Sequence, residues 1–168
     1  MKLKVGVLTV SDRSSRGQRE DRSGPVLVQE AKERGWSVER TDVVPDQRAQ
    51  IESRLRTWTD QHRLDLILTT GGTGFSPRDL TPEATRAVVD KPAPGLAEAM
   101  RAASLRITPH AMLSRAEAGI RNQTLIINLP GSPRAALENF EVVAPVIPHA
   151  VELLKEEESA EAGHRKID

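Results

Sequence analysis

The sequence predicts an α/β fold, a three-layer sandwich in which helices cover both faces of a mostly parallel central sheet. Short runs of β-branched and apolar residues recur along the chain, which is typical of strands buried on both faces. Segments with helical spacing of apolar residues separate these runs, and Gly and Pro mark many boundaries. We assign residues 1–154 to a single domain, because a chain of 168 residues fits one domain and shows no internal repeat.

Four segments are predicted as strands. Three are the apolar runs Lys4–Val10, Leu64–Thr69 and Thr124–Leu129, which are too short for confident helices and too apolar for half-exposed strands. The fourth, Trp36–Val44, alternates unevenly and ends before Pro45. Residues 114–121 fit neither period and are predicted as a short hairpin or a loop.

Helical segments lie between the strands. The first is predicted at Pro25–Arg34, because Gly24 and Pro25 give a start and Gly35 gives a stop. In the second, Gln47–Asp60, apolar residues recur at helical spacing. The others are predicted at Pro82–Val89, Leu96–Leu105 and Pro133–Val143, with a last helix after Pro145 and Pro148 that runs to Leu154. Residues 155–168 are charged and nearly without apolar side chains, so we expect a flexible tail.

Composition excludes several classes of function. The chain contains no cysteine, which removes disulfides, thiolate metal sites and cysteine nucleophiles, and favours a reducing, cytoplasmic location. The formal net charge is zero and aromatic residues make up 2% of the chain, so nucleic-acid binding is not expected. No apolar run approaches the roughly 20 residues of a membrane span. Any bound anion must therefore be held by a local pocket.

The first candidate pocket follows the third predicted strand. Gly71, Gly72, Thr73 and Gly74 lie there, and glycines let the backbone approach a ligand closely. Thr81 suits the N-cap of the next helix and Pro82 its first position. The helix would then present its positive dipole end to a phosphate.

A second loop repeats this pattern after the last predicted strand. Pro130 and Gly131 turn the chain, Ser132 caps, and Pro133 begins a helix. Two such loops on one sheet could hold the two ends of a phosphorylated ligand. The P-loop and dinucleotide motifs are absent, so neither an NTPase switch nor a dehydrogenase is favoured.

Two aspartates at strand ends could share a metal ion. Asp46 follows the second predicted strand and Asp79 follows the glycine loop. A Mg²⁺ ion bound with a nucleotide needs only one or two protein carboxylates, because phosphate oxygens and water complete its shell. The alternative is structural: Asp46 would cap the helix that begins at Gln47, and Asp79 would hydrogen-bond the turn before Thr81.

Other polar residues have two readings each. Ser11, Asp12 and the segment 21–24 could contact a ligand or simply form turns. Glu98 and Arg101 could be a helix-surface ion pair. Arginines near residues 114–121 suit phosphate, although most arginines in such a chain are solvated. The four histidines are far apart and receive no role.

Taken together, VGVLTVSD, EDRSG, VVPD, LILTTGGTGFSPRDLTPEAT, APGLAEAMR, MLSRAEAGIR and TLIINLPGSPRA resemble the molybdopterin adenylyltransferase family. This family includes the MogA-type enzymes and the G domains of gephyrin and its plant counterpart. The resemblance runs from about Val5 to Leu154. It implies an α/β sandwich that assembles as a homotrimer and transfers AMP from ATP to the terminal phosphate of molybdopterin, with Mg²⁺ and release of pyrophosphate. The product would pass to a downstream molybdenum-insertion protein.

Carried over by position, the resemblance implies a catalytic and metal-handling role for Asp46 and Asp79. The expected nucleotide- and pterin-binding residues are Ser11, Asp12, Gly71, Gly72, Thr73, Gly74, Arg78, Thr81, Glu98, Ser114, Arg115, Pro130, Gly131 and Ser132. Pro82 favours the MogA-like branch over the MoaB branch. Two rivals remain at this point, namely a non-catalytic molybdopterin-binding scaffold of the MoaB branch and a nucleotide hydrolase of the same fold.

Overall fold

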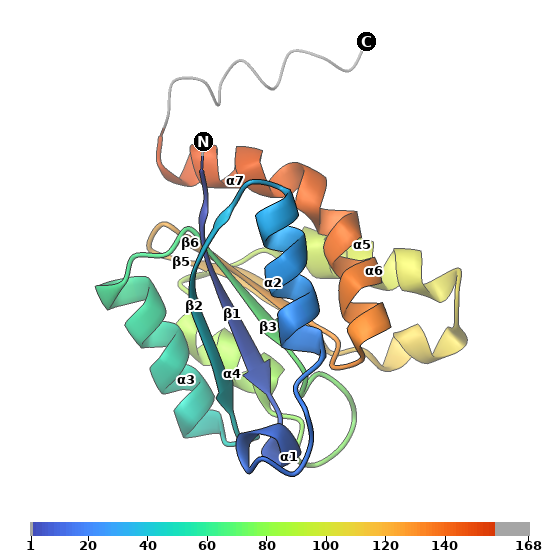
Figure 1. Cartoon of the computed structure of the whole chain (residues 1–168). Coiled ribbons are helices and arrows are strands. Elements are labelled where there is room, and N and C mark those ends of the chain that lie inside the picture. The colour runs from blue at the N-terminus through green and yellow to red at the C-terminus, as the bar shows by residue number, and fades with distance from the viewer. Residues whose placement is uncertain (1, 157–168) are drawn as a thin grey trace.

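The computed structural model describes residues 2–156 and shows one six-stranded sheet in the order β2-β1-β3-β6-β5-β4 (Figure 1). The neighbouring pairs β2/β1, β1/β3 and β3/β6 are parallel, and β5 is antiparallel to both β6 and β4. The strands are β1 (Lys4–Val10), β2 (Ser37–Val44), β3 (Leu66–Thr70), β4 (Lys91–Pro92), β5 (Ala118–Arg121) and β6 (Thr124–Leu129).

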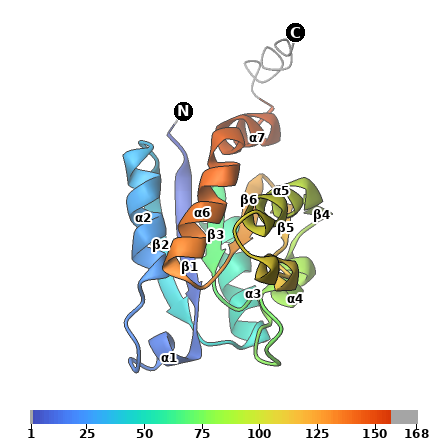
Figure 2. The ribbon, with the colours of Figure 1, turned by 90° about the vertical axis from the view of Figure 1, so that its right-hand side faces the viewer.

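Helices cover both faces of the sheet (Figures 1 and 2). They are α1 (Asp12–Ser15), α2 (Ser23–Glu33), α3 (Arg48–Arg56), α4 (Thr81–Val88), α5 (Pro94–Leu105), α6 (Pro133–Val143) and α7 (Ile147–Leu154). Buried residues of α2, α5, α6 and α7 form one core with the sheet, and those of α3 and α4 form a second core on the other side. The predicted three-layer, mostly parallel α/β fold is confirmed.

Most boundaries differ from the predicted ones by one or two residues. The helix predicted at Gln47–Asp60 is the exception, because α3 ends at Arg56 and a single π-helical turn, Thr57–Gln61, follows it. Trp58 in this turn is buried and packs where Gly6 of β1 has no side chain, since a Cβ there would lie 2.7 Å from the indole ring. The widened turn thus accompanies the packing of a large side chain on the sheet.

Four short elements within residues 2–156 were not predicted, namely α1, β4 and two 3₁₀ turns, Pro109–Leu113 and Ala144–Val146. The ambiguous residues 114–121 end in β5, which forms a hairpin with β6 through antiparallel pairing of Arg121 with Thr124. Residues 157–168 of the predicted tail lie outside the described residues, whereas Lys155 is described and its Nζ lies 2.8 Å from Asp65 Oδ1. Within residues 2–156, no helix is long and apolar enough to span a membrane.

The strand order places a crevice at the carboxyl ends of β1 and β3. The chain moves from β1 to β2 on one side, and β3 lies on the other side of β1. Connections therefore leave these two strands in opposite directions, and such a switch point is where open α/β sheets bind ligands.

Candidate active site

A cleft of about 360 Å³ lies at this switch point. Its walls are the ends of β1 and β3, the segment before α2, and the loop that leads from β6 into α6. Of the predicted site residues, it brings together Ser11, Asp46, Gly71, Gly72, Asp79, Gly131 and Ser132.

Glycines permit the close approach of three chain segments here. Gly71 has φ of +100°, and a Cβ on it would collide with the carbonyl oxygen of Val10 at the end of β1. A Cβ on Gly131 would lie 3.2 Å from the Cα of Gly71. The ends of β1, β3 and β6 can therefore meet only because these positions carry no side chain.

Main-chain amides line the cleft without protein partners. Within residues 2–156, the amides of Gly72, Gly131 and Ser132 donate no hydrogen bond to the protein. Ser132 is the N-cap of α6, and its hydroxyl accepts from the amide of Ala135 at 3.4 Å, as predicted. The positive end of α6 thus opens onto the cleft beside a set of available donors, an arrangement suited to an anion.

The predicted role of Thr81 is wrong. Leu80, not Thr81, is the N-cap of α4, and Thr81 is fully buried. The Thr81 hydroxyl donates to the Gly71 carbonyl at 2.9 Å, and its amide donates to the Gly72 carbonyl at 3.1 Å. Thr81 therefore holds the shape of the glycine turn, and its buried side chain does not line the cleft.

The second helix start at the cleft belongs to α2. Ser23 begins this helix and lines the cleft, together with Arg19, Asp21 and Arg22 from the preceding segment. Both carboxylate oxygens of Asp21 are engaged, one by the Thr9 hydroxyl at 2.8 Å and one by the amide of residue 24 at 3.1 Å. This bonding fixes the segment, which carries two basic and two acidic residues from position 19 to position 22, against β1. The EDRSG motif was the available signal, but the sequence did not show that its Arg22 and the preceding Arg19 reach the cleft.

Asp12 and Asp46 join the ends of β1 and β2. The Asp12 amide donates to Asp46 Oδ2 at 2.9 Å, and the Asp46 amide donates to Asp12 Oδ1 at 3.0 Å. The predicted alternative, in which Asp46 caps α3, is wrong, because the N-cap residue is Gln47 and no side-chain cap bond forms. Burial raises the pKa of Asp46, and the carboxylates of Asp12 and Asp79 raise it further.

Asp79 has both a turn role and a free oxygen. Its Oδ2 accepts from the Ser76 amide at 3.0 Å, so the turn reading is confirmed. Within residues 2–156 no hydrogen bond reaches its Oδ1, and the side chain lines the cleft. Arg78 pairs with Asp12 rather than standing free. Burial alone would raise the pKa of Asp12, but the Asp46 amide and the Arg78 guanidinium outweigh it and hold that pKa below its ordinary value.

The carboxylates of Asp46 and Asp79 suit a metal ion that is also coordinated by a bound phosphate ligand. Within residues 2–156, no group of three or more His, Cys, Asp or Glu side chains is arranged to hold an ion alone. Asp79 is close enough for its charge to raise the pKa of Asp46, and Asp79 keeps one oxygen available. Two such carboxylates suit an ion whose remaining ligands are phosphate oxygens and water.

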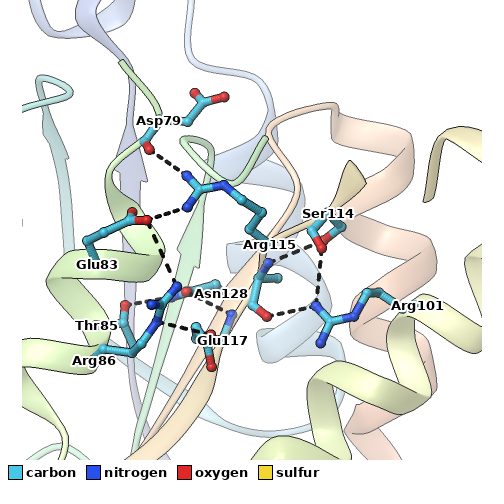
Figure 3. Close-up of polar contacts among 10 residues, drawn as sticks. Asp79, Glu83, Thr85, Arg86, Arg101, Ser114, Arg115, Glu117 and Asn128 are labelled. Atoms are coloured by element: carbon cyan, nitrogen blue, oxygen red, sulfur yellow. Dashed lines mark hydrogen bonds and ion pairs between the residues drawn. The ribbon is translucent and has the colours of Figure 1, made fainter. Parts of the chain in front are cut away.

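Several predicted site residues lie elsewhere. Glu98 is exposed on α5, and Arg101 donates to the carbonyls of Ser114 and Ala116 instead of pairing with Glu98. Ser114 and Pro130 line a separate, mainly apolar cavity of about 210 Å³. Arg115 was predicted to bind phosphate. Protein acceptors already bind its guanidinium (Figure 3), which leaves it unavailable for that role.

A larger cavity, of about 470 Å³, lies at the opposite end of the sheet, where β1, β3 and β6 begin. Lys4, Asp65 and Gln123 contribute to its walls. This cavity has neither a glycine turn nor the start of a long helix, and we therefore place the ligand site at the smaller cleft.

Comparison with known proteins places the chain in a family. The sequence model of a family described as a probable molybdopterin binding domain matches residues 6–149. Gephyrin from Dictyostelium discoideum is 48% identical over 98% of this chain, which spans only 24% of that protein. A molybdopterin adenylyltransferase from Helicobacter pylori strain J99 is 46% identical, with 90% of this chain and 88% of the relative covered.

Solved structures show the same fold. The molybdopterin biosynthesis enzyme MoaB from Thermus thermophilus superposes with a TM-score of 0.87 at 50% identity, covering 92% of this chain and 98% of that one. The molybdopterin biosynthesis Mog protein from Mycobacterium ulcerans gives a TM-score of 0.87 at 37% identity, covering 94% and 99%.

Proposed function

This chain belongs to the family of molybdopterin-binding domains, and we propose that it acts in molybdenum cofactor biosynthesis as a molybdopterin adenylyltransferase. The terminal phosphate of molybdopterin attacks the α-phosphorus of ATP, a new P–O–P bond forms, and the bond to pyrophosphate breaks. The observation that carries the proposal is the cleft in which the unpaired amides of Gly72, Gly131 and Ser132 lie beside Asp46 and Asp79.

The chemistry needs little acid or base catalysis. The attacking phosphate and the leaving pyrophosphate are both ionised at neutral pH, so the barrier lies in bringing polyanions together and stabilising the charge that develops. The amides at the start of α6 and the arginines at positions 19 and 22 supply hydrogen-bond donors on two sides of the cleft, with Glu20 and Asp21 beside these arginines. Among the described residues that line the cleft there is no histidine or cysteine, which fits this scheme.

Mg²⁺ is proposed as the cofactor, with Asp46 and Asp79 as the residues that would hold it. The ion would neutralise phosphate charge when bound. Asp12 and Arg78 brace Asp46, because Asp12 bonds to the Asp46 backbone and Arg78 pairs with Asp12. Phosphate binding is thus assigned to amides and loop arginines, and cation binding to the two aspartates.

The test is pyrophosphate release on incubation with molybdopterin, ATP and Mg²⁺. The proposal expects release that depends on the pterin and falls strongly in Asp79→Asn, while Asp42→Asn behaves as wild type. Asp42 is a matched control because it lies on the outer strand β2, outside the cleft, and pairs with Arg54 of α3. Pterin-independent release would instead indicate a hydrolase. Pterin binding without release would indicate a non-catalytic molybdopterin-binding protein.

We further propose a cytoplasmic homotrimer, formed by a single domain of residues 1–154, that passes its product to a molybdenum-insertion protein. Exposed apolar side chains on the corner between α5 and the turn after it, such as Ile107 and Met112, support self-association. Light scattering should give three times the chain mass of 18.4 kDa. A mass of one chain would contradict the trimer.

A further inference from the structure

One arginine outside the cleft is bonded to both ends of the loop that carries Asp79, and Figure 3 shows its contacts with the Asp79 carbonyl and with Glu83. The backbone amide of Arg115 donates to the Thr73 carbonyl at 2.8 Å. Its side-chain Nε donates to the Gly74 carbonyl at 2.7 Å, and its Nη2 donates to the Asp79 carbonyl at 2.7 Å. The loop from residue 73 to residue 79 is therefore closed by a single residue.

The loop has a small internal turn that orients Asp79. The Asp79 amide donates to the Ser76 carbonyl at 2.9 Å, and the Ser76 amide donates to Asp79 Oδ2 at 3.0 Å. These two bonds set the carboxylate relative to the loop but do not set the loop relative to the sheet. The loop is largely exposed from Phe75 to Arg78, so packing does not fix it either.

Arg115 is itself held from two sides. Its Nη1 forms an ion pair with Glu83 on α4. Burial alone would raise the pKa of Glu83, but the hydrogen bond and charge of Arg115, a backbone hydrogen bond and the charge of Arg86 together outweigh it and hold that pKa below its ordinary value. From α5, Arg101 donates to the carbonyls on either side of Arg115, those of Ser114 at 3.3 Å and Ala116 at 2.9 Å.

We propose that Arg115 is a positioning residue, which fixes the 73–79 loop so that the Asp79 carboxylate faces the cleft. The planar guanidinium is required because it reaches the Gly74 carbonyl, the Asp79 carbonyl and Glu83 with separate nitrogens in a fixed fork. A lysine ammonium at the same place is a point charge and cannot span these acceptors. The kinetic consequence rests on the proposed adenylyltransferase function, whereas the structural consequence does not.

The test compares Arg115→Lys with Arg121→Lys. Arg121 is a matched control, because it also forks between a carboxylate and a carbonyl, Asp60 and Val88, at a part-buried position outside the cleft. We expect Arg115→Lys to lower kcat about 10–100-fold, as expected for a misplaced group, and to raise the Mg²⁺ concentration needed for half-maximal rate. Arg121→Lys should leave both unchanged. Equal kinetics in the two variants would overturn the proposal.

Amide hydrogen exchange supplies a second measurement that needs no activity. Exchange at the Ser76 and Asp79 amides should be faster in Arg115→Lys than in wild type and unchanged in Arg121→Lys. Glu83→Gln, which keeps the arginine but weakens its hold, should give a smaller change in the same direction. Unchanged exchange in Arg115→Lys would overturn the positioning role. If wild type releases no pyrophosphate, the proposed function fails and the exchange data alone decide the role of Arg115.

Discussion

The replacement Gly71→Ala tests whether the close meeting of β1 and β3 builds the cleft. Gly71 has φ of +100°, a conformation that side chains rarely adopt. The new Cβ would also meet the carbonyl oxygen of Val10, which is backbone and cannot rotate away. The left-handed conformation alone costs about 1–2 kcal/mol, and forcing an extra carbon into a packed place adds about 1–3 kcal/mol. We therefore expect the free energy of unfolding to fall by roughly 2–5 kcal/mol.

A second glycine separates the two contributions. Gly35 follows α2 with φ of +77°, and nothing lies within 4 Å of the position of its Cβ. Gly35→Ala should therefore show the conformational cost alone, and the difference between the variants should be about 1–3 kcal/mol. With a urea m-value of about 2 kcal/mol/M, the Gly71→Ala midpoint should lie roughly 0.5–1.5 M below that of Gly35→Ala. Coincident midpoints would refute the close approach at Val10.

Three further predictions concern charge and buried polar groups. Asp46→Asn should raise the thermal midpoint at pH 7, because the raised pKa of Asp46 means that its ionised form is disfavoured in the folded state at every pH above its ordinary pKa of 3.8. The same replacement should abolish turnover. A lower thermal midpoint would contradict the first expectation. The hydrogen bond from Arg121 lowers the pKa of Asp60 in the folded state. This pair therefore stabilises the fold above pH 3.8, the ordinary pKa of the group, and its contribution is lost as the pH falls through the lower pKa of the folded state. The free energy of unfolding should therefore fall less steeply with decreasing pH in Asp60→Asn than in wild type. Identical slopes would count against a stabilising pair. Asn128→Leu should lower the free energy of unfolding in urea by about 1–3 kcal/mol, because buried Asn128 accepts from the Glu117 amide and donates to two threonine hydroxyls. An unchanged urea midpoint would show that the amide and the two hydroxyls form other hydrogen bonds in the variant.

Strand positions were predictable because burial leaves a strong local signal. Thr124–Leu129 is a run of apolar and β-branched residues, and the observed β6 has the same bounds. The N-cap Ser132 was equally local, since capping depends on residues within one turn. Both features are set by neighbours in the chain.

The errors concern residues whose role depends on distant partners. Thr81 matches an N-cap by type, yet its hydroxyl bonds to the Gly71 carbonyl across the loop. Arg115 suits phosphate by chemistry, but Glu83 and two carbonyls already occupy its guanidinium. Arg19 was passed over, and Arg22 was left as either a ligand contact or a turn residue, because only the folded chain brings them beside β1. Tertiary contacts that join segments far apart in sequence decide these roles.

The most direct test of the cleft is a titration of the ²H,¹⁵N-labelled protein with ATP and Mg²⁺, followed by amide chemical shifts. The site described above predicts the largest changes at Gly72, Gly131 and Ser132, the unpaired amides at the switch point. Changes confined to Lys4, Asp65 and Gln123, in the larger cavity at the other end of the sheet, would contradict it.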